Sequence, residues 1–282
     1  MTYGPAANRQ LPQIFSARNQ VRMRDDEHHW LQEQPLLSSI AMQPGQFTYP
    51  SYSEPLAEAY CGRFECAFIV LHPFIQVPGH LAWNTVQHYP DDEAIVAQGT
   101  KVPWAEVAAR TGLQTCARIN QALLTAIGSL DAHFADPSGR EALQDFLQAH
   151  PVWMPVEGRF EPLLQQDFLA AFALAEFDEL IFVPEFPQSG PAVQLPIADL
   201  RCGTVPFPSR GTLLAPDASF LFTVDWDSFF TLFYGTRAFV AYVASSQNLE
   251  GFFATTNTEH TWFNYSFGCA TVTLSPEHWQ TS

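Results

Sequence analysis

The 282-residue sequence lacks the motifs that identify several common enzyme classes. It has no GxGxxG or GxxxxGK[ST] phosphate loop, no GxSxG nucleophile elbow, no HExxH zinc motif and no EF-hand loop. It also has no run near the roughly 20 apolar residues of a bilayer-spanning helix, and no apolar core of a secretory signal. We therefore expect a soluble cytoplasmic protein with no membrane partner and no cofactor.

Paired cysteine motifs are absent as well. The chain contains no CxxC, and its odd number of cysteines is scattered: Cys61, Cys66, Cys116, Cys202 and Cys269. This pattern is typical of buried free thiols in a reducing compartment rather than of a disulfide framework or a structural zinc site.

Acidic residues are missing from the first 24 positions, which carry Arg9, Arg18, Arg22 and Arg24. The rest of the chain has nine basic against 29 acidic residues, a net charge of −20. Such a surface repels phosphate backbones and anionic membranes and attracts cationic proteins. We therefore expect no nucleic-acid partner. The acidic surface either binds a cationic protein partner or serves only to keep the protein soluble.

The first 60 residues are rich in Pro, Gln, Ser and Tyr without periodicity, which predicts an N-terminal arm or wrapping segment. Residues 61–282 are predicted to form a single domain. It begins with a buried strand at 66–72, closed by Pro73.

Apolar periodicity and turn residues divide this domain into a helical part and a β part. A first helix is predicted to start at Pro90–Glu93. Further helices are predicted at 103–112, 113–127, 140–149, 162–177 and 237–246. The predicted strands cover 180–183, 219–224, 229–234 and 251–255, and 184–216 is predicted to be a meandering connection. The sequence thus predicts an α+β fold, with a mainly helical first half packed on a mostly antiparallel sheet from the second half.

The acidic turn Asp225-Trp226-Asp227-Ser228 separates two aromatic-rich strands of a predicted hairpin. Two carboxylates at a strand end can hold a divalent cation that bridges a diphosphate, as in metal-dependent sugar transferases. Asp-x-Asp-Ser is also ordinary turn chemistry, which we favour. Both hypotheses place the carboxylates of Asp225 and Asp227 outward, at the tip of the hairpin.

Glu259 and His260 follow the strand at 251–255 and are candidates for acid–base work beside that turn. A hydrogen-bonded surface pair is the simpler interpretation. His72, at the end of the strand 66–72, is either a strand-end binding group or a satisfied core histidine, and we favour the core role.

The segment 105–124 resembles a helix-turn-helix in outline, but it offers only Arg110 and Arg118 to phosphates. An internal helical hairpin is the better interpretation.

Tryptophan is abundant for a core of this size, and Trp226 and Trp262 are candidate anchors of a protein interface.

Four runs carry a resemblance to a known family: Ile69–Phe74, Trp104–Gly112, Asn120–Gly128 and Val224–Phe229. In these runs the chain resembles a bacterial protein family catalogued only as a domain of unknown function, over about residues 65–262. The resemblance implies a bacterial cytosolic origin and no particular activity.

Two functions remain open. The first, which we prefer, is a non-catalytic, immunity-like or regulatory module that binds a cationic protein. The alternative is a divalent-metal-dependent enzyme, a glycosyl or small-molecule transferase or hydrolase, using Asp225, Asp227, Glu259 and His260.

Overall fold

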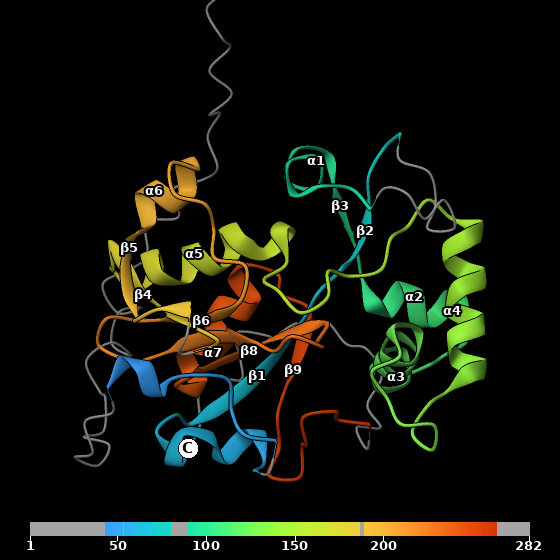
Figure 1. The fold of residues 1–282 in the computed structure, drawn as a ribbon, viewed down its shortest axis with the longest axis horizontal. Helices are drawn as coiled ribbons and strands as arrows, with labels where there is room; N and C mark the ends of the chain where they lie inside the picture. Colours follow the sequence, from blue (N-terminus) through green and yellow to red (C-terminus); the bar gives the residue numbers. More distant parts are fainter. Residues whose placement is uncertain (1–42, 53, 80–88, 187–188, 264–282) are drawn as a thin grey trace, which may run out of the picture. The chain divides into compact units, whose positions relative to one another are not determined.

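A computed structural model describes residues 43–52, 54–79, 89–186 and 189–263 of the chain. The chain divides into two units, Met1–Pro35 and Leu36–Ser282, and the first lies wholly outside the described residues. The architecture below is that of the second unit (Figure 1).

The centre of this unit is an antiparallel sheet whose described part has seven strands in the order β5-β4-β6-β7-β8-β1-β9. Its strands are β1 Cys66–Leu71, β4 Glu179–Pro184, β5 Val193–Pro196, β6 Gly211–Leu214, β7 Leu221–Val224, β8 Phe230–Gly235 and β9 Gly251–Phe253. A separate two-stranded ribbon pairs β2 (Phe74–Gln76) with β3 (Thr100–Val102).

Several of the helices begin or end at capping residues that are visible in the sequence. They are α1 Asp92–Gln98, α2 Trp104–Thr111, α3 Cys116–Ile127, α4 Pro137–Ala149, α5 Gln165–Leu174, α6 Ile197–Cys202 and α7 Arg237–Ser246. Asp91 caps α1 by accepting from the Ala94 amide at 2.8 Å, and Gly112 ends α2 with a left-handed φ of 73°. Asp136 caps α4, so that helix begins three residues before the predicted start.

The α+β class is confirmed, but two details of the predicted arrangement are wrong. Helices are not confined to the first half: α5 and α7 lie where helices were predicted in the second, and α6 adds a third that was not predicted. The connection 184–216 is not a simple meander, because it holds β5, α6 and β6. Figure 1 shows α2, α3 and α4 gathered in one group, apart from α5 and α6 beside β4 and β5.

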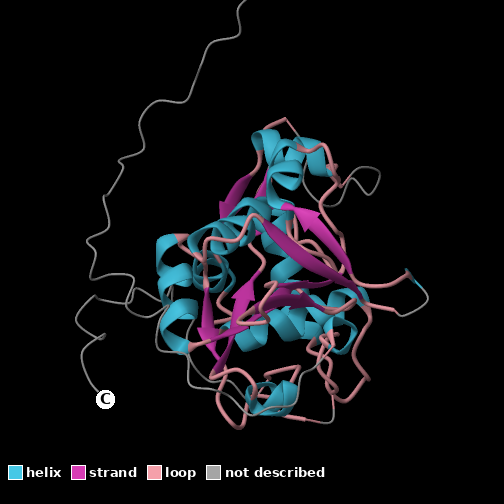
Figure 2. Ribbon diagram, turned by 90° about the vertical axis from the view of Figure 1, so that its left-hand side faces the viewer, coloured by secondary structure: helices cyan, strands magenta, loops and turns pink. Residues whose placement is uncertain are grey.

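Every residue of β7 and β8 is buried, so both faces of the sheet are covered at these aromatic strands, whereas the edge strand β5 is largely exposed. Figure 2 shows helices around the strands. On one face, Phe222 of β7 stacks on Phe233 of β8 at 4.2 Å between ring centroids. Phe168 of α5 lies 4.7 Å from Phe222, and Phe239 of α7 lies 6.1 Å from Phe233. This face is therefore closed by α5 and α7.

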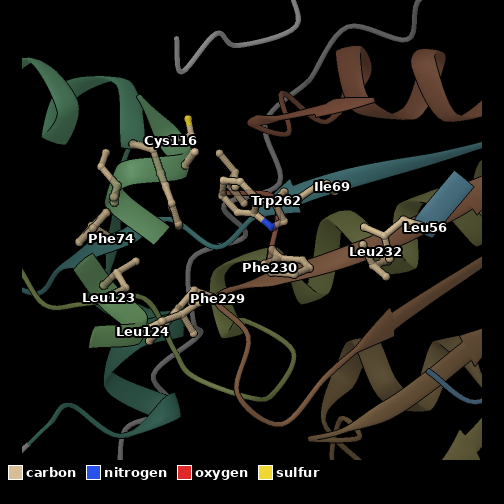
Figure 3. Close-up of a cluster of buried hydrophobic side chains, with 14 of the residues drawn as sticks. Leu56, Ile69, Phe74, Cys116, Leu123, Leu124, Phe229, Phe230, Leu232 and Trp262 are labelled. Carbon is tan, nitrogen blue, oxygen red and sulfur yellow. The ribbon is translucent and has the colours of Figure 1, made fainter. Parts of the chain in front are cut away.

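The opposite face packs into a larger core, part of which is drawn in Figure 3. Ile69, Phe230 and Leu232 point into it from the sheet, and Phe74, Leu123 and Trp262 meet them from other segments. The described part of the predicted arm contributes as well, since Phe47 and Leu56 are buried in the same core. A division of the chain at residue 60 stays a prediction.

The cysteines differ from the expectation of buried free thiols. Cys61, Cys66 and Cys202 are free, but only Cys66 is buried. Cys116 is disulfide-bonded. Among the described cysteines the expectation therefore holds for Cys66, is wrong about burial for Cys61 and Cys202, and is wrong about the free thiol for Cys116. The cysteines no longer support a reducing compartment.

Candidate functional site

The predicted hairpin is present, and its turn is the centre of the candidate site. Val224 of β7 pairs with Thr231 of β8, and the Ser228 hydroxyl donates to the Asp225 carbonyl at 2.9 Å. At the tip only the Trp226 side chain projects freely, with 57% of its surface exposed. Asp227 is half-buried and Asp225 only 7% exposed, so the prediction that both carboxylates point outward is wrong for Asp225.

Asp225 is drawn inward by a residue far away in the sequence. Tyr52, from the segment before β1, donates its phenol hydrogen to the Asp225 carboxylate. Partial burial, together with this hydrogen bond, raises the pKa of Tyr52 far above its usual range, although 61% of the surface of the residue is exposed. The phenol therefore stays protonated, and the pair fastens the segment around Tyr52 to the hairpin turn.

His260 completes this side of the turn. Its ring lies 4.7 Å from the ring of Tyr52, and its Nε2 lies 3.2 Å from the Glu54 carbonyl. Since a carbonyl only accepts, we assign the proton to Nε2, which leaves Nδ1 to accept from the Tyr49 hydroxyl at 3.4 Å. Burial lowers the pKa of His260, in keeping with this neutral form. The structure thus brings Asp225 and His260 together, and it engages both in internal contacts.

A loop from 156 to 161 packs against the other side of the turn. The Gly158 amide donates to the Ser228 carbonyl at 2.9 Å, and Arg210 Nε donates to the Gly158 carbonyl at 2.7 Å. Gly158 has a φ of +63°, and a Cβ there would lie 1.8 Å from the Trp226 carbonyl oxygen. Only glycine lets the two backbones approach this closely.

Negative charge exceeds positive charge around the tip. Burial and then repulsion from Asp225 raise the pKa of Asp227, while burial and then repulsion from Asp227 raise that of Glu157. The pKa of Glu185 is raised by burial and by Asp225. Arg210, 3.5 Å from the Glu185 carboxylate, lowers all three pKa values without cancelling the effect.

We call this surface the tip patch, and it comprises Tyr52, Asp225, Trp226, Asp227, Glu157 and Glu185. Sequence reasoning found its three central residues from the acidic turn. It missed Tyr52, Glu157 and Glu185, which come from distant segments and carry no local signal that links them to the turn.

The remaining predicted site residues lie elsewhere. Glu259 is exposed beside His260, and no contact places it on Asp225 or Asp227. Trp262 is 1% exposed and packs edge-on against Phe230 and Phe252 at 5.7 and 5.2 Å, so it is a core residue (Figure 3). It presents no surface to a partner in this fold.

His72 is fully buried and has the core role that the sequence favoured. Its Nδ1 donates to the Val156 carbonyl at 3.1 Å, and its Nε2 accepts from the Thr231 hydroxyl at 2.9 Å. Burial lowers its pKa to about 4. His72 is therefore neutral and satisfied at neutral pH.

The predicted helix-turn-helix segment is an internal hairpin of α2 and α3, which pack on each other and on α4. Its arginines are paired with carboxylates, Arg110 with Glu106 at 2.8 Å and Arg118 with Asp136 at 3.0 Å. Neither guanidinium is held ready for a phosphate.

The described residues contain neither a cluster of metal-ligating side chains nor a membrane-spanning helix. No group of three or more His, Cys, Asp or Glu side chains among them is placed to hold a metal ion. No helix in the described ranges is long and apolar enough to cross a membrane.

The fold and the site define an α+β protein with an acidic, aromatic tip. The profile of a family described as "Protein of unknown function (DUF2711)" matches residues 52–264, so the chain belongs to that family. The match begins at Tyr52, the residue that holds Asp225.

The chain is also similar to "Uncharacterized protein YwbB" of Bacillus subtilis (strain 168), at 33% identity over 98 residues. The match covers 32% of this chain and 43% of that protein. Comparison with the solved structures gives no significant match.

Proposed function

We propose that the protein is a non-catalytic, immunity-like or regulatory module that binds a cationic segment of a partner protein at the tip patch. The observation that carries this proposal is the pair of aromatic side chains at the tip. Trp226 is 57% and Tyr52 61% exposed. Trp226 follows Asp225 in the sequence, and Tyr52 donates a hydrogen bond to the carboxylate of Asp225. Exposed Trp and Tyr rings are frequent anchors of protein interfaces.

The charge of the patch supports a cationic ligand in particular. Asp227, Glu157 and Glu185 have raised pKa values because burial and neighbouring carboxylates disfavour their ionised forms. A bound guanidinium or ammonium group relieves that repulsion, and it also gains from contact with the face of an indole ring. The net charge of −20 after residue 24 adds long-range attraction to the same partners.

The same contacts argue against acid–base catalysis at the turn. A general acid or base needs a free position from which to exchange a proton with a substrate. Asp225 is engaged by Tyr52, and the nitrogens of His260 face the Glu54 carbonyl and the Tyr49 hydroxyl. Trp226 and Asp227 are then the groups of the turn that remain available for binding.

Calorimetric titration with an octa-arginine peptide at low and high salt tests the proposal. We expect Trp226→Ala and Asp227→Asn each to weaken binding about tenfold at low salt, since each removes one favourable contact with the cation. Phe134→Ala and Glu141→Gln alter an equally exposed ring and an exposed acid away from the turn, and we expect less than about a twofold change. Equal losses in all four variants, or none in the tip variants, would rule out a specific site at the tip.

A divalent-metal-dependent transferase or hydrolase remains the second candidate. One observation favours it: repulsion from Asp225 contributes to the raised pKa of Asp227, so the two carboxylates of the turn lie near each other. Titration with Mn²⁺ and with Mg²⁺ should then show binding that Asp225→Ala and Asp227→Ala abolish. Absence of binding, or binding that both variants retain, removes this candidate.

A further inference from the structure

Behind the tip patch lies a carboxyl group that the proposed function does not use. Glu161 ends the loop 156–161 and is fully buried. Its Oε2 accepts from the Val156 amide at 3.2 Å, and its Oε1 accepts from the Leu163 amide at 3.3 Å. The side chain of Glu161 therefore links the start of the loop, at Val156, to the short 3-10 helix Pro162–Leu164 that follows the loop.

These two hydrogen bonds compensate poorly for a buried negative charge. Charge-assisted bonds from N–H to carboxylate are typically about 2.7–2.9 Å long, shorter than either distance here. The nearest cation in the loop, Arg159, directs its guanidinium to Asp92 of α1 instead, through two contacts of 2.6 Å. An ionised Glu161 would thus be buried without a cation in direct contact.

The charged groups around Glu161 leave its carboxyl group with a raised pKa, as the geometry indicates. Arg159 favours its ionised form, Asp92 opposes it, and Tyr89 lies within electrostatic range. Burial is the largest influence and raises the pKa of Glu161 to about 7. His72, joined to the loop through the Val156 carbonyl, is neutral above about pH 4.

We propose that the loop 156–161 is a pH-sensitive latch, closed against the hairpin turn when Glu161 is protonated and opened when Glu161 ionises. Opening hydrates the carboxylate and breaks the contact between the Gly158 amide and the Ser228 carbonyl. It also moves Glu157, one residue before Gly158, away from Asp227. The latch does not depend on the proposed partner, because it concerns the free protein.

Amide hydrogen exchange of Gly158 measures the latch directly. In the closed loop the pKa of Glu161 is about 7, against 4.5 in water. Ionisation therefore makes opening about 30-fold more frequent at pH 8.5 than at pH 5.5. After division by the intrinsic exchange rate at each pH, the Gly158 rate should rise by about that factor in the full-length protein.

Two variants isolate the effect of Glu161. Glu161→Gln should remove the pH dependence, whereas Glu141→Gln, which changes an exposed carboxylate of α4 away from the loop, should keep it. A corrected Gly158 rate that is flat in the wild type, or that still rises with pH in Glu161→Gln, overturns the proposal. If Glu161→Gln does not fold, carboxyl ¹³C NMR and Gly158 exchange of the wild type decide together: a Glu161 midpoint near 7, with a corrected exchange rate that levels off above that midpoint, supports the latch. A Glu161 midpoint near 4.5, or an exchange rate that does not change across the Glu161 titration, refutes it.

Discussion

Replacing Gly158 with alanine is expected to lower the free energy of unfolding by about 3–5 kcal/mol. The added Cβ would lie 1.8 Å from the Trp226 carbonyl oxygen, and both atoms belong to or adjoin backbone that cannot rotate away. The loop must therefore move, which breaks the hydrogen bonds from Gly158 to Ser228 and from Arg210 to Gly158. Urea unfolding of the purified variant measures the loss.

Gly128→Ala is the matched control, because it separates the close contact from backbone strain. Gly128 ends α3 with a φ of +77°, similar to that of Gly158, but a Cβ there meets nothing within 4 Å. Alanine at Gly128 should cost only about 1 kcal/mol, the strain of a left-handed residue with a side chain. Equal losses at the two glycines would mean that the loop does not press on the turn.

The pH dependence of stability should change in shape when Glu161 is replaced with glutamine. His72 and Glu161 are both buried, and their pKa values move in opposite directions, to about 4 and about 7. The unfolded chain binds more protons at His72 than the folded chain does, so the contribution of His72 to the free energy of unfolding rises with pH between about 4 and 6.5. The folded chain binds more protons at Glu161, so the contribution of Glu161 to the free energy of unfolding falls with pH between about 4.5 and 7. In the wild type the two nearly cancel where these ranges overlap.

Each contribution amounts to about 3 kcal/mol across its range. Relative to the wild type, Glu161→Gln should therefore gain about 3 kcal/mol as the pH rises from 4 to 8, whatever its absolute stability. Urea midpoints at half-unit pH intervals give this difference, and the exposed change Glu141→Gln should leave it near zero. Curves for Glu161→Gln and the wild type that run parallel would contradict the burial of an ionisable Glu161.

Local elements were predictable where the chain marks them with residues of its own. The hairpin around the acidic turn, the end of α2 at Gly112 and the helix 237–246 were all confirmed, because a turn or cap depends on neighbours within a few residues. The start of α4 was missed because Asp136 was not recognised as a cap. The short elements β5, α6 and β6 were not predicted, because the prolines and glycines around them are typical of loops.

The site was less predictable, because its key contacts join distant segments. Nothing near Tyr52 indicates that its hydroxyl meets Asp225, and nothing near Gly158 indicates that its amide meets the Ser228 carbonyl. Because the central strands are buried on both faces, they show no alternation of apolar and polar residues that would indicate which aromatic side chains are exposed. Trp262, a predicted anchor outside the strands, is enclosed in the core that packs on the sheet.

The position of β1 has a consequence for how the protein is made. Cys66–Leu71 lies between β8 and β9, both of which come from residues beyond 229. A ribosome therefore releases this wholly apolar segment long before either of its hydrogen-bonding neighbours has been translated. Until then the segment lacks its sheet partners, and the growing chain completes this core only after Trp262, one of its buried residues, has emerged.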